Sequence, residues 1–140
     1  MRWPARLEWQ GNILLDGAHN PQGVHALAAF VRENLWQKRR ILLTGILSDK
    51  ANAEMLLTLG AVADCIVTVT PDSPRAIGAA ELADRFRALG FDAQPAMNAQ
   101  QALQLAKTLA GEDGIVIAAG SLYLMGTLRT LLGASPITTV

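Results

Sequence analysis

The sequence has few of the residues from which metal sites and disulfide frameworks are built. It contains one cysteine and two histidines, and these three residues do not cluster at the spacing of a zinc site. A disulfide framework is excluded because it needs more than one cysteine. Cys65 lies in an apolar run, and we expect it to be a buried strand residue.

The sequence also lacks an excess of charge of either sign. Its 12 lysine and arginine residues balance 12 aspartate and glutamate residues, so no net basic field is available to hold a nucleic acid or an anionic membrane. No segment approaches the ~20 apolar residues of a membrane span, and no apolar stretch of signal-peptide length follows residues 1–4. We therefore expect a cytoplasmic protein with no nucleic-acid or membrane partner.

Two phosphate-binding patterns are absent as well. The 140 residues contain neither G-x-x-x-x-G-K-[ST] nor G-x-G-x-x-G, so no cradle for a triphosphate or a dinucleotide is visible. The chain is therefore not a complete P-loop enzyme. With 51% apolar residues it is long enough for one well-packed core. We expect a single domain over residues 1–140 that ends in a tail at 134–140.

Apolar strands and helical stripes alternate along the chain. The glycine-bearing break at Gln10-Gly11 can join two antiparallel strands, and Asn20-Pro21 supplies an N-cap and a first-turn proline. The later strands are apolar on both faces, which is typical of a parallel sheet covered by helices. We predict strands at 6–9, 12–16, 41–45, 65–70, 91–95 and 114–120, and helices at 21–35, 54–60, 82–89, 98–110 and 121–132.

This order predicts a Rossmann-like α/β domain. Its sheet should be mostly parallel, with helices on both faces and an antiparallel N-terminal hairpin. Ligands of such folds bind beyond the carboxyl ends of the strands. The loops after Leu15, Thr44, Thr70 and Ala119 are therefore the expected positions of a site.

The loop after Leu15 carries the strongest constellation. It places Asp16, His19 and Asn20 in one strand-to-helix turn, where free backbone N–H groups can meet a phosphate or a carboxylate. Asp16 can accept hydrogen bonds from sugar hydroxyls, and His19 can donate to an anionic oxygen or carry a proton. The alternative is that Asp16 and Asn20 only complete the turn and the cap, while His19 points to solvent.

Three further places carry polar side chains. Asp49 and Lys50 follow a long strand, although a solvated charged pair would explain them equally well. Ser121 brings a hydroxyl to the start of the last helix, where it could be only a cap. Arg6 has a rigid charged fork suited to a phosphate or a ring edge, with an ordinary surface arginine as the alternative.

Several short motifs follow one another along the chain. They are W-P-A-R-L-E at 3–8, D-G-A-H-N-P at 16–21, G-I-L-S-D-K at 45–50, S-P-R-A at 73–76 and G-S-L-Y-L-M-G at 120–126. In this order they resemble the folylpolyglutamate synthases and dihydrofolate synthases, relatives of the Mur ligases. The second and fifth motifs are specific in combination. The family commonly has glycine where Ala5 stands.

The resemblance implies that this chain is the carboxy-terminal domain of an ATP-dependent ligase. An amino-terminal P-loop domain would complete the enzyme and carry the ligands of Mg²⁺, and this domain would hold no metal. ATP would phosphorylate a carboxylate of dihydropteroate or folate, and the amine of L-glutamate would attack the acyl phosphate. The isolated domain would be inactive.

The resemblance also implies roles for single residues. Arg6, Asp16 and Asn20 would bind the ATP. His19 and Ser121 would be catalytic residues that face the cleft between the two domains. The alternative function is a stand-alone module that binds a nucleotide or another anion without catalysis.

Overall fold

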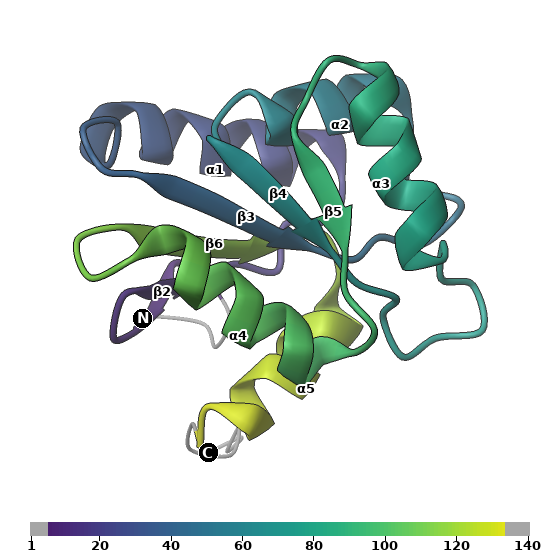
Figure 1. The fold of residues 1–140 in the computed structure, drawn as a ribbon. Coiled ribbons are helices and arrows are strands. Elements are labelled where there is room, and N and C mark those ends of the chain that lie inside the picture. The colour runs from purple at the N-terminus through teal and green to yellow at the C-terminus, as the bar shows by residue number, and fades with distance from the viewer. Residues whose placement is uncertain (1–5, 134–140) are drawn as a thin grey trace, which may run out of the picture.

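The computed structural model describes residues 6–133, so the predicted tail at 134–140 and Ala5 lie outside the described residues. Strands and helices alternate as predicted (Figure 1). None of the helices in the described part of the chain is long and apolar enough to cross a lipid bilayer. The elements are β1 (Glu8–Gln10), β2 (Ile13–Leu15), α1 (Pro21–Asn34), β3 (Arg40–Thr44), α2 (Ala53–Gly60), β4 (Cys65–Thr68), α3 (Ala79–Ala88), β5 (Ala93–Pro95), α4 (Ala99–Ala110), β6 (Ile115–Ala119) and α5 (Leu122–Leu131).

The strands form one sheet in the order β1-β2-β6-β3-β4-β5. β1 and β2 pair antiparallel and every other neighbouring pair is parallel, which confirms the predicted hairpin and sheet. The last strand of the chain therefore lies between the second and the third. The loops after β2, β6 and β3 consequently leave the sheet side by side at its carboxyl edge.

Helices cover both faces of the sheet, as predicted. α1, α2 and α3 pack on one face and α4 and α5 on the other (Figure 1). Successive strand residues point to opposite faces: Leu42 lies in the first apolar cluster, whereas Ile41 and Leu43 lie in the second. Cys65 is a buried, unpaired strand residue of the second cluster, which confirms its predicted role.

The predicted helix boundaries agree with the structure to within one residue, except that α3 begins at Ala79, before the predicted start at Leu82. The Asn20 side chain accepts a hydrogen bond from the Gly23 N–H at 2.8 Å and caps α1. Gly90 adopts a φ of +95°, a conformation that favours glycine, directly after the C-cap of α3. Gly60 is the last residue of α2, and a side chain does not fit there because its Cβ atom would lie 2.6 Å from the Phe91 Cδ2 atom.

Candidate functional site

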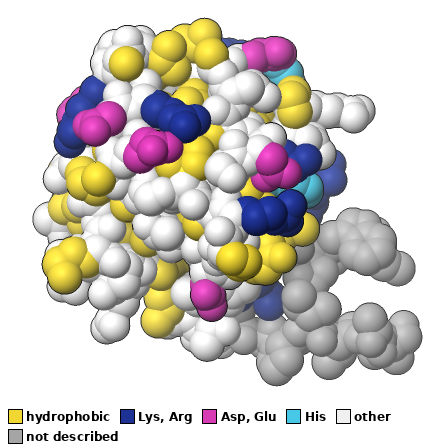
Figure 2. Space-filling view, turned by 90° about the vertical axis from the view of Figure 1, so that its right-hand side faces the viewer, with side chains coloured by type: hydrophobic (Ala, Val, Ile, Leu, Met, Phe, Trp, Pro, Cys, Tyr) yellow, Lys and Arg dark blue, Asp and Glu magenta, His cyan; other side chains and the backbone are white. Residues whose placement is uncertain are grey.

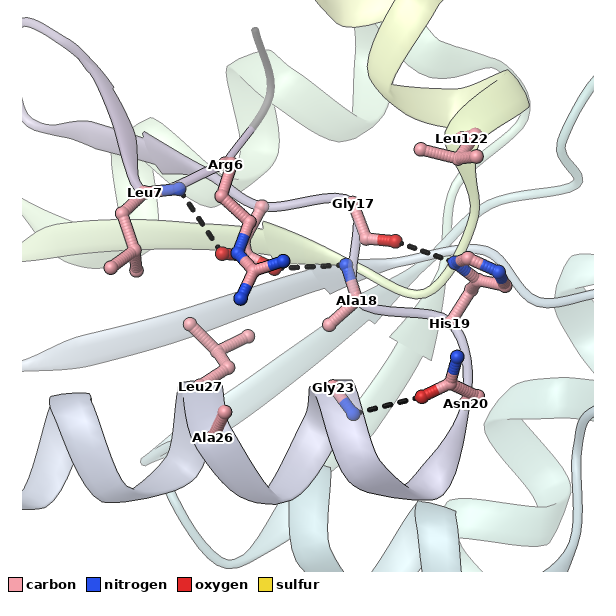
Figure 3. A pocket seen from close by; sticks show the side chains of 11 residues that line it. Arg6, Leu7, Gly17, Ala18, His19, Asn20, Gly23, Ala26, Leu27 and Leu122 are labelled. Carbon is pink, nitrogen blue, oxygen red and sulfur yellow. Dashed lines mark hydrogen bonds between the residues drawn. The ribbon is translucent and has the colours of Figure 1, made fainter. Parts of the chain in front are cut away.

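A cavity of about 270 Å³ opens beside the turn between β2 and α1. Asp16 lines it at the end of β2 and is only 4% exposed. Its Oδ1 accepts a hydrogen bond from the Ala18 N–H at 2.9 Å, and its Oδ2 accepts one from the Leu7 N–H at 3.1 Å (Figure 3). The carboxylate thus links the segment before β1 to the turn between β2 and α1.

The surroundings of Asp16 act on its charge in opposite directions. Burial raises the pKa of Asp16 above its ordinary value, while the two backbone hydrogen bonds and the Arg6 charge oppose that rise without cancelling it. Arg6 is exposed and lines the same cavity. The cavity therefore presents a guanidinium that is free to meet an anion, next to a carboxylate that is held by the backbone.

His19 lies deeper than a solvent-facing loop residue would. It is half-buried, and its Nδ1 lies 2.9 Å from the Gly17 carbonyl oxygen. A carbonyl oxygen only accepts hydrogen bonds, so Nδ1 carries a hydrogen and the Nε2 atom accepts in the neutral ring or donates in the charged one. Asn20 also lines the cavity, with its side-chain oxygen used by the cap of α1.

A second cavity of about 290 Å³ adjoins the first and shares His19 and Leu122 with it. Its other lining residues come from the loops after β3, β4 and β6, which lie far apart in the sequence, and from the first turn of α5. Figure 2 looks onto this side of the molecule, where a histidine lies among basic and acidic side chains. Besides His19 and Leu122, the residues that line the second cavity are Leu47, Asp49, Lys50, Arg75, Gly120, Ser121 and Tyr123.

Backbone hydrogen bonds bring the charged residues of the second cavity together. Leu47 and Ala76 form an isolated antiparallel bridge, and the Ser48 N–H donates to the Arg75 carbonyl oxygen at 2.7 Å. Asp49 consequently pairs with Arg75, with 3.5 Å between Oδ2 and Nη1, although the sequence placed it beside Lys50. Arg75 was missed as a site residue, although it stands in the loop after β4 and within the S-P-R-A motif at 73–76.

Ser121 is both a cap and a cavity residue. It is 2% exposed, and its Oγ accepts hydrogen bonds from the Tyr123 and Leu124 N–H groups at 3.1 and 3.4 Å. The predicted capping role is confirmed. The hydroxyl hydrogen is not used by the cap and remains available as a donor.

The two turns that carry the predicted residues are tied to each other. The Gly120 N–H donates to the Ala18 carbonyl oxygen at 2.8 Å, and the Thr44 hydroxyl donates to the Ala119 carbonyl oxygen at 2.7 Å. The predicted residues Arg6, Asp16, His19, Asn20 and Ser121 therefore lie along one edge of the sheet. No group of three or more histidine, cysteine, aspartate or glutamate residues that could hold a metal occurs within residues 6–133.

Comparison with known proteins assigns this arrangement to a family. The family model described as "Mur ligase, glutamate ligase domain" matches residues 5–122. The chain belongs to this family. Its fold is accordingly that of a Mur ligase carboxy-terminal domain.

Relatives of this Mur ligase domain are folate enzymes. The chain is 36% identical over 136 residues to a folylpolyglutamate synthase of Lacticaseibacillus casei, and the match covers 94% of this chain and 30% of that protein. It is 30% identical over 139 residues to a dihydrofolate synthase/folylpolyglutamate synthase of Bacillus subtilis (strain 168), covering 93% and 30%. The domain thus spans about a third of the length of these relatives.

Solved structures of such enzymes share the fold. One is the Mycobacterium tuberculosis folylpolyglutamate synthase complexed with ADP and AMPPCP, with a TM-score of 0.84, 29% identity, and coverage of 97% of this chain and 34% of that one. Another is a bifunctional folylpolyglutamate synthase/dihydrofolate synthase with Mn, AMPPNP and L-glutamate bound. It has a TM-score of 0.82 and 25% identity, and the match covers 94% of this chain and 32% of that one.

Proposed function

We propose that this Mur ligase domain works as the carboxy-terminal half of an ATP-dependent ligase that adds L-glutamate to dihydropteroate or folates. The observation that carries the proposal is the pair of adjoining cavities that share His19 and Leu122. A P-loop domain in the rest of the enzyme would supply the triphosphate cradle. The names of the relatives support this reaction class.

The first cavity is suited to part of a nucleotide. Arg6 offers a charged planar fork to a phosphate or to the face of a base. Asp16 keeps lone pairs beyond its two backbone hydrogen bonds, and Asn20 keeps its amide N–H donors. The described residues offer no group of three or more metal ligands, and the P-loop domain would hold the Mg²⁺.

The second cavity is suited to the dicarboxylate substrate. Lys50 and Arg75 outnumber Asp49 among its charged residues, which leaves the cavity positive apart from any charge on His19. L-glutamate carries two carboxylates, and each can accept charge-assisted hydrogen bonds from a lysine or an arginine. The hydroxyl of Ser121 adds a neutral donor at the base of the cavity.

The proposed chemistry has two steps. The γ-phosphoryl group of ATP moves to a substrate carboxylate, which gives an acyl phosphate and ADP. The glutamate nitrogen then attacks the acyl carbon, the bond from that carbon to the phosphate oxygen breaks, and the nitrogen releases a proton. His19 lines both cavities, and the Nε2 atom of its neutral ring would accept that proton. Positioning of the two substrates supplies the rest of the domain's contribution.

The KM for glutamate and the KM for ATP test the two proposed binding sites separately. This chain would be joined to a P-loop domain of a matched relative, and glutamate incorporation would be measured in this joined protein. Arg75→Gln should raise the KM for glutamate about 10- to 100-fold, the loss of one charge-assisted hydrogen bond, with the KM for ATP unchanged. Arg6→Gln should raise the KM for ATP and leave the KM for glutamate unchanged, so each variant is the control for the other. Equal effects of both variants on both constants would contradict the assignment.

Calorimetry of the chain alone distinguishes the proposed ligase domain from a stand-alone nucleotide-binding module. Half of a divided site should bind ATP negligibly by itself. Micromolar affinity for ATP, combined with no ligase activity of the joined protein, would instead indicate a stand-alone nucleotide-binding module.

A further inference from the structure

The outward side of α5 is apolar and carries no charge. Of the seven large apolar side chains that are exposed within residues 6–133, three lie on this helix, with exposed fractions of 59% for Leu122, 50% for Tyr123 and 43% for Leu131. Residues four apart along a helix lie on the same side of it, so these side chains form one face together with residues 126, 127 and 130. We call it the α5 outer face. It consists of the exposed residues Leu122, Tyr123, Gly126, Thr130 and Leu131 and the half-buried residue Thr127.

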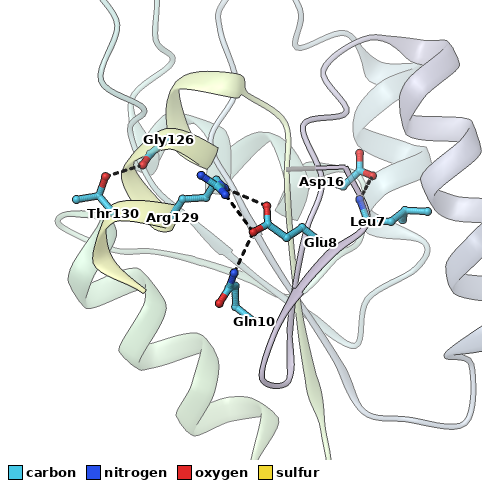
Figure 4. A network of polar contacts seen from close by, with 7 residues as sticks. All are labelled: Leu7, Glu8, Gln10, Asp16, Gly126, Arg129 and Thr130. Carbon is cyan, nitrogen blue, oxygen red and sulfur yellow. Dashed lines mark hydrogen bonds and ion pairs between the residues drawn. The ribbon is translucent and has the colours of Figure 1, made fainter. Parts of the chain in front are cut away.

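The charged residue of α5 is paired with the neighbouring strand instead of lying on this face. The Arg129 Nε donates a hydrogen bond to the Glu8 carboxylate at 3.0 Å and its Nη2 donates another at 3.3 Å, which ties α5 to β1 (Figure 4). The two side chains are only 12% and 14% exposed. Each of the other four helices in the described part of the chain exposes at least one charged side chain, so the α5 outer face differs from them. Examples are Arg32 in α1, Glu54 in α2, Glu81 in α3 and Lys107 in α4.

The threonine hydroxyls of the face are satisfied within the helix. The Thr127 hydroxyl donates to the Tyr123 carbonyl oxygen at 3.2 Å, and the Thr130 hydroxyl donates to the Gly126 carbonyl oxygen at 3.1 Å (Figure 4). A protein surface that covers this face would therefore leave neither hydroxyl hydrogen unpaired. The face thus offers a partner mainly apolar groups.

Nothing within residues 6–133 requires a glycine at position 126. Apart from its chain neighbours and the backbone of its own helix, no heavy atom lies within 4 Å of an added Cβ atom, and Gly126 does not have a positive φ. Glycine weakens the interior of a helix relative to alanine. Its place in the middle of an exposed face is explained if another surface approaches the helix closely there.

The position of this face indicates what covers it. Leu122 lines both cavities and Tyr123 lines the second, so the face continues from the candidate site. The chain spans about a third of the length of its relatives, and the P-loop domain proposed for the remainder has to reach the same cavities to deliver a phosphoryl group. The centres of protein interfaces are depleted of charged residues and enriched in tyrosine. The composition and the place of the α5 outer face both fit this partner.

We propose that the α5 outer face is the docking surface for the amino-terminal P-loop domain of the enzyme. This inference rests on the proposed function and extends it, because it places part of the interface between the two domains along α5, outside both cavities. The partner surface should be apolar and uncharged, and it should come closest to α5 at Gly126. Docking would fix the start of α5, where Ser121 lies, relative to the nucleotide that the P-loop domain holds.

Photo-crosslinking in the joined protein tests the inference. A benzophenone amino acid would replace Thr127, which lines neither site cavity, and mass spectrometry would identify the peptides that it captures after irradiation. We expect capture of peptides from the P-loop domain of the same molecule. Thr58 in α2 is the matched control position, because it is also a half-buried threonine whose hydroxyl donates to the carbonyl oxygen four residues earlier, at 2.9 Å. It lies on the opposite face of the sheet and should capture no such peptide.

Three crosslinking results would overturn the inference. One is that position 127 captures no peptide of the P-loop domain, and another is that position 58 captures the P-loop domain equally well. The third is capture of a second molecule that increases with protein concentration, because this result would indicate that another copy of the chain covers the face.

A charge on the α5 outer face should weaken docking and slow the reaction. Thr127→Lys should lower the rate of glutamate incorporation at saturating substrate concentrations about 5- to 100-fold, because its ammonium group would lose water at the interface. Thr58→Lys should leave this rate unchanged. Lysine is a better helix former than threonine, so both variants should fold, and urea unfolding checks this. Equal rates of the two variants would contradict the docking role.

The two experiments distinguish failure of this inference from failure of the proposed function. If the joined protein incorporates no glutamate, the ligase assignment fails, while crosslinking from position 127 still decides whether the P-loop domain docks on α5. If the joined protein is active but position 127 captures no peptide of the P-loop domain, docking on α5 fails and the proposed function stands.

Discussion

Replacing Gly120 with alanine should destabilise the domain severely. Gly120 joins β6 to α5 with a φ of +113°, which an L side chain rarely adopts. A Cβ atom there would lie 2.5 Å from the Thr44 Oγ1 and 2.9 Å from the Gly45 carbonyl oxygen. Neither neighbour can withdraw easily, because the Thr44 hydroxyl is bonded to the Ala119 carbonyl oxygen and the other atom belongs to the backbone.

Two costs add in the Gly120→Ala variant. The backbone conformation costs about 1–3 kcal/mol for a residue with a side chain, and overpacking of a tight site costs about 1–3 kcal/mol more. The sum of about 2–6 kcal/mol is a large part of the 5–15 kcal/mol by which a typical domain is stable. The same shift would displace Ser121, so the ligase activity of the joined protein should fall as well.

Gly126→Ala is the matched control, since Gly126 closes the same motif. Gly126 is exposed inside α5, and apart from its chain neighbours and the backbone of its own helix no heavy atom lies within 4 Å of an added Cβ. Alanine there should stabilise the domain by about 0.5–1 kcal/mol. Urea unfolding followed by circular dichroism measures both variants. The reasoning fails if Gly120→Ala stays within about 0.5 kcal/mol of the parent, or if both variants destabilise equally.

Further substitutions test other parts of the structure. Gly60→Ala should cost about 1–3 kcal/mol in urea unfolding because of the Phe91 ring, and the loss should disappear in a Phe91→Ala background. Ser121→Ala and Asn98→Ala each remove a helix cap worth about 0.5–2 kcal/mol, but only Ser121→Ala should lower ligase activity, since Asn98 lines neither site cavity. Burial raises the folded-state pKa of Asp16, so its contribution to stability is full below its ordinary value of 3.8 and is lost as the pH rises through the raised pKa. The free energy of unfolding of the parent relative to Asp16→Asn should therefore decrease as the pH rises above about 4.

The fold and half of the candidate site were predictable because their signals are local. Alternating apolar strands and helical stripes predicted every element, and Asn20 and Ser121 cap the helices that they were expected to start. Parallel strands end at one edge of a sheet, so the loops after Leu15 and Ala119 were expected to meet there. The hairpin turn bends at Gly11, within the predicted break at Gln10-Gly11.

The rest depended on contacts between segments that are distant in the sequence. The insertion of β6 between β2 and β3 places Ser121 and His19 at one cavity, and the bridge from Leu47 to Ala76 carries Arg75 into the same cavity. Residues of these loops carry no pattern that names their partners, because pairing of strands far apart in the chain depends on packing of the whole sheet.

Asp16 shows most clearly which features the sequence determined and which the tertiary structure decided. Its sequence position indicated a carboxylate at the end of a strand, facing a helix N-terminus. Only the folded chain brings the Leu7 N–H within 3.1 Å of it, from a segment on the other side of the hairpin, and buries the carboxylate. Local propensity thus determined where the polar residues stand along the chain, and burial together with long-range hydrogen bonding decided which of them meet.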